Sequence, residues 1–282
     1  MMNSVIEVKE ASFYYGEKEV FDKISLSVNS GEILCIVGPN GCGKTTFLDC
    51  ILGLLKLKKG EIFVNGGNIR NISEKQRAEE MAYIPQSHER TFPYTVEEIV
   101  LMGRAHKTGM FSSPSKKDRH IAVEAISKVG IGYLLNKPYT QISGGEGQLV
   151  MVARALAQQS RIIIMDEPTA HLDFKNELML LETITNLIEE RAITIIMATH
   201  FPNHAYYFEN NGIPTTLALM NDGNFKAIGR PSEILNETNI KKIYSVNSKV
   251  IKCNIENNIS IRQVVPLSID KEEKTGIRRK DN

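Results

Sequence analysis

The chain has 282 residues, of which 42% are hydrophobic and 24% charged, as in soluble globular proteins of one large or two modest domains. Its 34 lysines and arginines nearly balance 33 aspartates and glutamates, so its composition gives no support for a nucleic-acid partner. No apolar run approaches the ~18–20 residues of a membrane span, so any role at a membrane would need another polypeptide to span it. The N-terminal residues do not have the pattern of a secretion signal, and the four cysteines lack paired spacing. We therefore expect a cytoplasmic protein.

The first part of the chain is expected to form antiparallel strands between Val5 and Val28, which are joined at a turn after Tyr15. There follow, in chain order, a strand over 33–37, a helix over 44–55, a strand over 60–64, a helix capped by Ser73 and Gln76, and a strand over 82–84.

The middle of the chain, about 87–160, is predicted to be a helical subdomain. Its expected parts are a helix opened by a capping box at Thr95 and Glu98, a polar loop over 108–118, and helices over 121–129 and 148–158. The last part is expected to hold strands over 162–165 and 193–198, a helix over 177–191 and a hairpin turning at 221–224. The apolar strands lack alternation, which predicts a parallel sheet covered on both faces.

A phosphate-binding pattern, G-x-x-x-x-G-K-[ST], occupies the loop between the strand over 33–37 and the following helix. Its residues are Gly38, Pro39, Asn40, Gly41, Cys42, Gly43, Lys44 and Thr45, with Thr46 directly after them. Backbone N–H groups of such a loop converge on phosphate oxygens, and the helix adds its positive N-terminal end. We expect Lys44 to reach the β- and γ-phosphates and the Thr45 hydroxyl to bind Mg²⁺. A chance glycine loop is the alternative, which the flanking strand and helix disfavour.

Cys42 lies inside this loop and beside Lys44, where a thiolate would be stabilised. One hypothesis is therefore a reactive cysteine that bound ATP protects. The alternative, which has equal weight, is a small residue tolerated in the loop.

The strand over 162–165 ends in two carboxylates, Asp166 and Glu167. At the carboxyl edge of the sheet Asp166 can orient Mg²⁺ and its waters, and Glu167 can polarise a water for attack on the γ-phosphorus. An ordinary charged turn after a strand is the alternative, and the phosphate loop upstream favours the functional interpretation.

The hexapeptide Ser143-Gly144-Gly145-Glu146-Gly147-Gln148 is the rarest feature of the chain. Together with the phosphate loop and the Asp166-Glu167 pair, it makes residues 4–247 resemble the ATPase subunits of ATP-binding cassette (ABC) transporters. The resemblance implies a P-loop NTPase fold: a mainly parallel RecA-like core sheet, an N-terminal antiparallel β subdomain and the inserted helical subdomain. Beyond it, we expect a small β appendage over 248–270 and a disordered tail over 271–282.

The resemblance also implies roles for single residues, with ATP and Mg²⁺ as cofactors. Tyr15 matches the aromatic residue that stacks on adenine, although Tyr14 and Phe13 adjoin it. Gln86 matches the glutamine that touches Mg²⁺ and senses the membrane partner. His200 matches the switch histidine at the γ-phosphate, so that the catalytic set is Glu167, His200, Lys44 and Gln86.

Two further elements match parts of the family that act on the opposite subunit. Ser143, Gly144, Gly145 and Glu146 match the signature motif that contacts the ATP of a neighbour, and Asp173 matches the loop that crosses to it. A different interpretation of His200 is a metal pair with His204, but Pro202 lies between them and no third ligand is evident.

The implied function is ATP-driven import. Two ATPase subunits, as a homodimer or paired with a second ABC ATPase, would work at the cytoplasmic face of the membrane with an integral membrane permease and an extracytoplasmic substrate-binding protein. The stretches 95–104, 142–146, 231–235 and 243–246 are similar to importers of iron chelates, haem, cobalamin and related metal compounds. A soluble ABC ATPase for repair, translation or cluster assembly is the alternative. A non-catalytic nucleotide-binding module is disfavoured because Lys44, Asp166, Glu167 and His200 are all intact.

Overall fold

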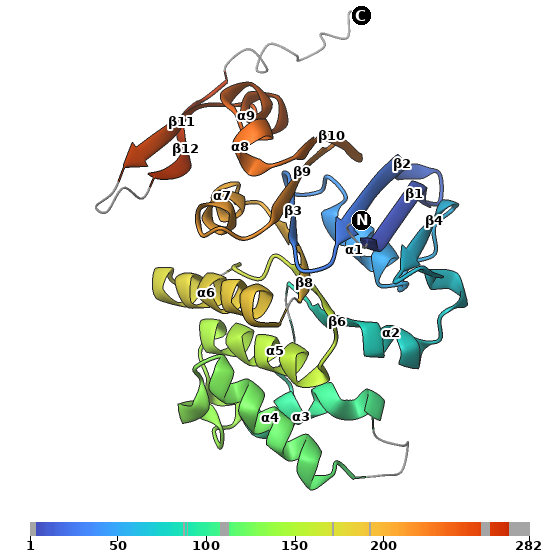
Figure 1. The fold of residues 1–282 in the computed structure, drawn as a ribbon, viewed down its shortest axis with the longest axis vertical. Helices are drawn as coiled ribbons and strands as arrows, with labels where there is room; N and C mark the ends of the chain where they lie inside the picture. Colours follow the sequence, from blue (N-terminus) through green and yellow to red (C-terminus); the bar gives the residue numbers. More distant parts are fainter. Residues whose placement is uncertain are drawn as a thin grey trace, which may run out of the picture.

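The structure is a computed structural model, and it describes residues 4–86, 88, 90–107, 113–170, 172–191, 193–254 and 260–270. Two sheets and the helices between them form the main body, with the helical subdomain at one end and a two-stranded hairpin at the other (Figure 1). None of the helices in these ranges is both long and apolar enough to span a membrane.

An antiparallel sheet is built from the N-terminal part of the chain, in the order β2-β1-β4-β5. Its strands are β1 (Ser4–Tyr15), β2 (Lys18–Asn29), β4 (Lys59–Val64) and β5 (Gly67–Asn68). Strand β1 pairs with β2 through the turn after Tyr15, which confirms the predicted antiparallel pair.

A second sheet of six strands has the order β10-β9-β3-β8-β7-β6. Its strands are β3 (Ile33–Val37), β6 (Met81–Ile84), β7 (Ile162–Asp166), β8 (Thr194–Thr199), β9 (Thr215–Asn221) and β10 (Asn224–Gly229). All neighbours in it are parallel except β9 and β10, which are antiparallel. The mainly parallel core of a P-loop NTPase is therefore confirmed.

Both faces of this sheet are covered, which explains why its strands are apolar throughout. In β3, Ile33, Cys35 and Val37 pack toward helices α5 (Gly144–Gln158) and α6 (Phe174–Arg191). Leu34 and Ile36 point the other way, into a cluster with helix α1 (Lys44–Ile51) and the antiparallel sheet. Strand β3, which leads into the phosphate loop, is thus held rigidly from two sides.

The helical subdomain consists of α3 (Val96–Leu101), α4 (Lys116–Lys128), α5 and short 3₁₀ turns. The turns are η2 (Met102–Lys107), η3 (Gly132–Leu134) and η4 (Tyr139–Gln141), and outside the subdomain lie η1 (Ile69–Asn71) and α2 (Glu74–Glu80). The predicted capping boxes at Ser73 and Thr95 are both present.

Several predicted helix boundaries were wrong, among them the start of α6, which lies at Phe174 rather than 177. Helix α4 begins at Lys116, inside the stretch predicted to be a loop, because Ser115 and Asp118 form a capping box. Helix α5 begins at Gly144 rather than 148, and α1 ends at Ile51 rather than 55, where Gly53 follows with a φ of +69°. In each case apolar periodicity misjudged a helix end that local backbone chemistry determines.

The C-terminal part adds α7 (Asn203–Asn210), α8 (Pro231–Ile234), α9 (Glu237–Tyr244) and a hairpin of β11 (Val246–Asn254) with β12 (Ser260–Ile269). The hairpin contacts α7 and α9, and the Asn203 side chain exchanges hydrogen bonds with the backbone of Val264. A boundary at residue 247 would fall within β11. The segment predicted to be disordered, 271–282, lies outside the described residues.

Candidate functional site

The phosphate loop joins β3 to α1 with a backbone that few residue types could adopt. Gly41 and Gly43 have φ values of +80° and +108°, in the region that favours glycine. At Gly38 a Cβ atom would lie 2.1 Å from the Met220 carbonyl oxygen, so no side chain fits there. The first backbone N–H groups of α1 therefore face the loop without a capping side chain, as anion binding requires.

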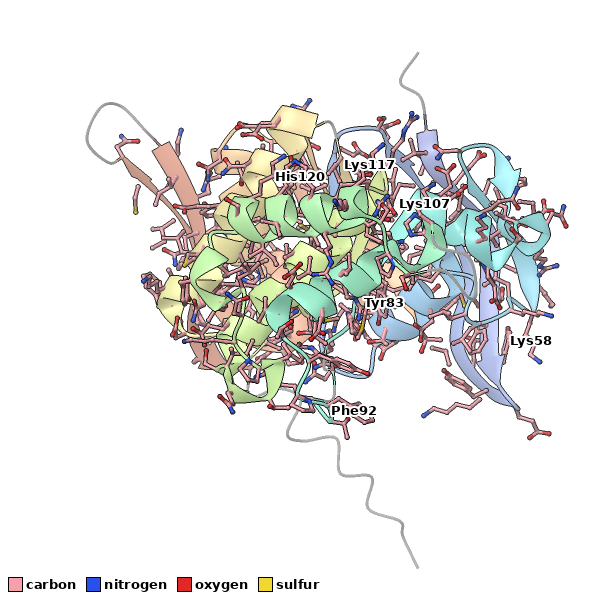
Figure 2. All side chains as sticks on the ribbon, turned by 90° about the horizontal axis from the view of Figure 1, so that it is seen from below. Lys58, Tyr83, Phe92, Lys107, Lys117 and His120 are labelled. Carbon is pink, nitrogen blue, oxygen red and sulfur yellow. The ribbon has the colours of Figure 1, made fainter. Side chains whose placement is uncertain are left out.

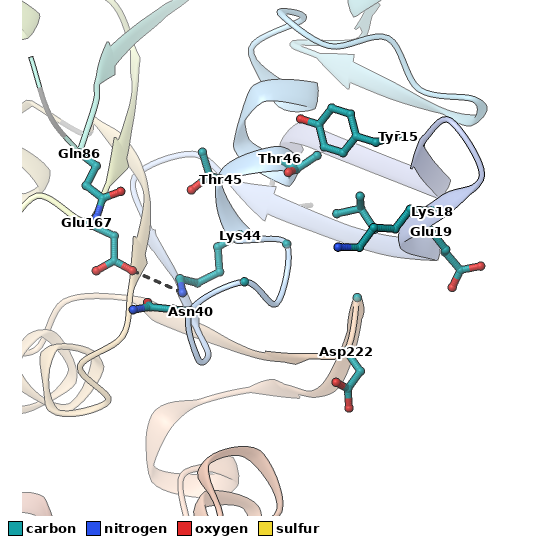
Figure 3. Close-up of a pocket in the computed structure, with 14 residues that line it drawn as sticks. Tyr15, Lys18, Glu19, Asn40, Lys44, Thr45, Thr46, Gln86, Glu167 and Asp222 are labelled. Carbon is teal, nitrogen blue, oxygen red and sulfur yellow. Dashed lines mark ion pairs between the residues drawn. The ribbon is translucent and has the colours of Figure 1, made fainter.

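Lys44, the first residue of α1, is buried beneath this loop. Its Nζ atom donates to the carbonyl oxygens of Gly38 at 2.8 Å and Pro39 at 3.1 Å. The same Nζ lies 3.4 Å from Oε1 of Glu167 (Figure 3). The ammonium group is thus held between the loop and the second carboxylate of the Asp166-Glu167 pair.

Asp166 ends β7 beneath the phosphate loop and is only 1% exposed. Its Oδ1 atom is buried and has no hydrogen-bond partner among the described residues, an arrangement that costs free energy unless a ligand completes it. Burial raises the pKa of Asp166, while a hydrogen bond with Thr45 lowers it. An unpartnered carboxylate oxygen beside a threonine hydroxyl fits a hard cation such as Mg²⁺.

Glu167 follows Asp166 with a φ of +48°, a conformation that costs a non-glycine residue about 1–3 kcal/mol. Its backbone N–H donates to the Ala198 carbonyl oxygen at 2.9 Å, which ties this turn to β8. Its buried carboxylate contacts Lys44 and the Nδ1 atom of His200. The structure therefore assembles Lys44, Glu167 and His200 into one cluster, as their predicted roles require.

These residues border a pocket of about 720 Å³ at the carboxyl edge of the parallel sheet. In Figure 3 the β1–β2 turn with Tyr15 lies on one side of Lys44, and Gln86 with Glu167 lies on the other. The remaining lining comes from three segments: Lys18, Glu19, Val20, Asn40, Gly41, Gly43, Thr45, Thr46, Asp222 and Gly223.

Tyr15 is the aromatic residue of its run that is free to meet a ligand. Its side chain is 54% exposed at the pocket, whereas Phe13 is buried and the Tyr14 hydroxyl donates to Asp22 at 3.1 Å. This placement favours Tyr15 over both neighbours, and adenine stacking on it stays a prediction.

His204 does not join His200 as a metal pair. Its ring nitrogens face the Thr199 hydroxyl at 3.1 Å and Glu177 Oε1 at 2.7 Å. In the described ranges no three His, Cys, Asp or Glu side chains gather as a metal site. The two histidines have different contacts: His200 contacts the carboxylate of Glu167, and His204 holds the segment between β8 and α7 through Thr199 and Glu177.

The hypothesis of a reactive Cys42 was wrong in its physical premise. Burial raises the pKa of the Cys42 thiol, and the opposing charge of Lys44 is the smaller effect. The side chain is buried in a cluster with Phe47 and Met220. Cys42 is therefore a small packed residue of the loop.

The signature motif begins α5 and does not line the pocket of its own chain. Ser143 is the N-cap: its hydroxyl accepts from the Glu146 N–H at 3.2 Å, and Glu146 accepts from the Ser143 N–H at 2.8 Å. Ser143 and Gly144 are exposed. Asp173 likewise caps the start of α6, where its carboxylate accepts two hydrogen bonds from Asn176, at 2.8 and 3.1 Å.

The two segments that the resemblance assigns to the opposite subunit lie against each other. A Cβ atom on Gly145 would come within 2.6 Å of the Asn176 side chain, so the signature backbone rests directly on the first turn of α6. Sequence reasoning missed this contact, and it also missed Lys18, Glu19 and Asp222 at the pocket. The predicted hairpin turn at 221–224 was the one available signal for Asp222.

Comparison with known proteins shows the family of the chain. Residues 21–170 match the family model described as ABC transporter. The iron(3+)-hydroxamate import ATP-binding protein FhuC of Bacillus subtilis is 31% identical over 251 residues, covering 89% of this chain and 91% of the relative. The molybdate import ATP-binding protein MolC of Haemophilus influenzae is 32% identical over 244 residues, covering 86% of this chain and 89% of the relative.

A solved structure of an ABC transporter assigned to the metal-chelate type, in an inward-facing conformation, superposes with a TM-score of 0.82. It is 30% identical and covers 94% of this chain and 98% of its own. The fold and the phosphate site thus define a P-loop ATPase of the cassette type. The chain belongs to the ABC transporter family as an ATP-binding subunit, and it hydrolyses ATP with Mg²⁺ as cofactor.

Proposed function

We propose that the chain is the ATP-hydrolysing subunit of an ABC importer, in which MgATP closes a head-to-tail dimer and hydrolysis reopens it. The observation that carries this proposal is the division of the site. The pocket holds the phosphate loop, Glu167 and Gln86, whereas the signature residues Ser143 and Gly144 are exposed elsewhere. A second anion-binding helix terminus that does not serve its own pocket is suited to a nucleotide held by another copy.

The residues of one pocket can carry out the phosphate chemistry in named roles. Lys44 can turn its Nζ from the loop carbonyls toward the β- and γ-phosphates, a short rotation of a long side chain. Asp166, Thr45 and Gln86 would hold Mg²⁺, which neutralises phosphate charge when bound. Glu167 is placed to take a proton from the attacking water, and His200 to contact the γ-phosphate.

The second copy completes the arrangement with donors on the opposite side of the nucleotide. Ser143 and the amides of Gly144 and Gly145 would bind the γ-phosphate, and Asp173 would cross the interface beside them. Loss of the γ-phosphate removes the group that both copies share. The dimer then opens, and this alternation is what we propose drives a separate integral membrane permease.

For the cargo we propose an iron chelate, haem, cobalamin or a related metal compound. Two relatives support a metal-containing substrate: one is named for the import of iron(3+)-hydroxamate and the other for the import of molybdate. The proposal extends to an extracytoplasmic substrate-binding protein that delivers the cargo and to a location on the cytoplasmic face of the membrane. A soluble ABC ATPase without a permease is the competing function.

Two measurements test the proposal. Glu167→Gln is expected to retain nucleotide binding, lose turnover and accumulate dimers with MgATP, read by size-exclusion chromatography with light scattering. Glu182→Gln, an exposed carboxylate on α6, is the matched control and is expected to behave as the parent. Normal turnover in Glu167→Gln would remove the residue from its role, and monomers at saturating MgATP would contradict the dimer.

The permease is tested by co-purification from membranes with a tagged chain, followed by ATPase assays with the proposed metal compounds. Stimulation by one of them supports import. A tagged chain that stays free of any polytopic membrane protein would favour the soluble ATPase.

A further inference from the structure

Arg90 contacts the signature motif from a distant part of the sequence. The residue lies between β6 and α3, four positions after Gln86. Its Nη1 donates to the carbonyl oxygens of Ile142 at 2.7 Å and Ser143 at 3.0 Å, and its Nη2 donates to that of Gly144 at 3.2 Å. One guanidinium group thus joins three consecutive carbonyls where the signature enters α5.

The signature itself is shaped to receive this guanidinium. A Cβ atom on Gly147 would lie 2.1 Å from Nη2 and 2.6 Å from Cζ of Arg90, so any other residue there would displace it. The Tyr139 ring lies 5.2 Å from the same Cζ, within the range of a cation–π contact. His88 stacks on that ring at 5.5 Å. Two independent features therefore define one binding position for the Arg90 guanidinium: its hydrogen bonds to the three carbonyls, and the space left by the missing side chain of Gly147.

The position of this charge has an electrostatic consequence. A helix N-terminus already carries a partial positive charge, and α5 begins at Gly144, which is exposed. Arg90 adds a full positive charge within hydrogen-bond distance of the first carbonyls of that helix. Its planar fork also restrains the peptide planes of Ile142 to Gly144, which orient Ser143 and the glycine amides.

We propose that Arg90 is a positioning residue for the signature half-site, which holds Ser143 and the Gly144 and Gly145 amides in the orientation that binds the γ-phosphate of a partner copy. This inference rests on the proposed head-to-tail dimer. The same loop carries Gln86 into the chain's own pocket, so Arg90 links the pocket of one nucleotide to the half-site of the other. Phe92, two residues further on, is exposed at the edge of the molecule (Figure 2).

Three substitutions test the role in a Glu167→Gln parent, in which ATP-bound dimers accumulate. Arg90→Ala removes the fork, Arg90→Lys keeps the charge without it, and Gly147→Ala pushes the guanidinium away. The obstructed atom is the tip of a flexible side chain, so Gly147→Ala is expected to fold. Arg119→Ala is the matched control, an exposed arginine elsewhere in the helical subdomain that pairs with Glu97.

The expected result is selective. Nucleotide affinity of the monomer stays at the parent value, because Arg90 does not line its own pocket. The MgATP concentration for half-maximal dimerisation rises on the order of tenfold in Arg90→Ala and Gly147→Ala, as expected for loss of charge-assisted hydrogen bonds. Arg90→Lys recovers part of the loss, and Arg119→Ala matches the parent.

Mixed dimers that keep the native Glu167 separate positioning from general damage, because the Glu167→Gln parent has no turnover to compare. When Arg90→Ala and Lys44→Ala are on different subunits, the intact phosphate loop faces an intact signature, and one working site remains. When both changes are on one subunit and its partner is native, the intact loop faces the altered signature, and turnover falls on the order of tenfold further. Equal turnover of the two mixed dimers would overturn the inference. A Glu167→Gln parent that stays monomeric would overturn the dimer itself and the inference with it.

Discussion

The buried histidine His204 offers the sharpest test of how the backbone on either side of His200 is held in place. Its ring is 3% exposed, with Nε2 facing Glu177 Oε1 at 2.7 Å and Nδ1 facing the Thr199 hydroxyl at 3.1 Å. Because a carboxylate accepts, the network assigns the ring proton to Nε2, and Nδ1 then accepts from Thr199. The Thr199 oxygen in turn accepts from the Phe201 N–H at 3.1 Å. This chain of hydrogen bonds brackets His200 on both sides.

His204→Leu keeps a similar volume and removes both hydrogen bonds of the ring. One of them is to a carboxylate and one is neutral, so their loss corresponds to about 2–4 kcal/mol of unfolding free energy. A domain with about 5–15 kcal/mol of stability stays folded after such a loss. The melting temperature should fall by roughly 2–4 °C per kcal/mol.

The functional effect should be larger than the structural one. His200 contacts Glu167, and a displacement of about 1 Å in a catalytic group can cost on the order of a hundredfold in rate. We expect kcat of His204→Leu to fall by about ten- to a hundredfold, with KM for ATP within about twofold, because the phosphate-loop contacts of Lys44 are unchanged.

The assay is steady-state ATPase activity of the variant, with melting temperature and ATP affinity measured on the same preparation. His120→Leu is the control, since His120 is an exposed histidine on α4 (Figure 2). A variant that loses the expected stability but keeps full kcat would refute the link between His204 and the switch histidine. A rise in KM as large as the fall in kcat would show general damage to the pocket instead.

Three other changes have clear expected outcomes. Lys44→Ala should weaken ATP binding by tenfold or more, since the buried ammonium is the cation at the phosphate loop, and unchanged affinity in titration calorimetry would contradict this. Phe47→Ala should lower the free energy of unfolding by about 3–5 kcal/mol, because the ring is fully buried and packs edge-on against Phe21 and Phe225 at 5.6 and 5.5 Å; urea titration measures it. Hydrogen bonds from Ser115 and Arg104 lower the pKa of Asp118 to about 2. The ionised carboxylate therefore stabilises the fold at pH values above its ordinary pKa, and this contribution is lost as the pH falls toward 2. Asp118→Asn should therefore be less stable than the parent at pH 7, with a gap that narrows in acid; a gap independent of pH would refute the charge-based account.

The parts of the site that the sequence predicts are those built from consecutive residues. The phosphate loop is a single turn of backbone between a strand and a helix, so its glycines and Lys44 suffice to place it. Asp166 and Glu167 end an apolar strand, and parallel strands present their carboxyl ends at one edge. Local rules of this kind need no knowledge of the tertiary structure.

The parts that the sequence does not predict depend on contacts between distant segments. Glu177 meets His204 across helices α6 and α7, and Arg90 reaches the signature across more than 50 positions. Neither residue carries a local pattern that names its partner, because a glutamate on a helix and an arginine in a loop are ordinary solvated residues. Gly147 comes nearest to a sequence signal for this contact. A glycine inside a helix lowers helix stability by about 1 kcal/mol relative to alanine, which suggests that another group needs the space.

The start of α5 illustrates how a local rule and a functional site coincide. Apolar periodicity begins only after Gly147, yet Ser143 and Glu146 have the spacing of a capping box, which places the helix start where the structure has it. The capping box fixes the hydrogen bonds of the Ser143 and Glu146 side chains. Glu146 is held by the Ser143 N–H and the Tyr133 hydroxyl, so it is occupied as a cap. The Ser143 oxygen accepts from the Glu146 N–H, which leaves its own proton free to donate outward, toward the place where a partner's γ-phosphate would bind. In the proposed dimer, the two residues that begin the helix would therefore also set the Ser143 hydroxyl to act as a donor. A different N-cap residue could begin the helix without supplying that hydroxyl.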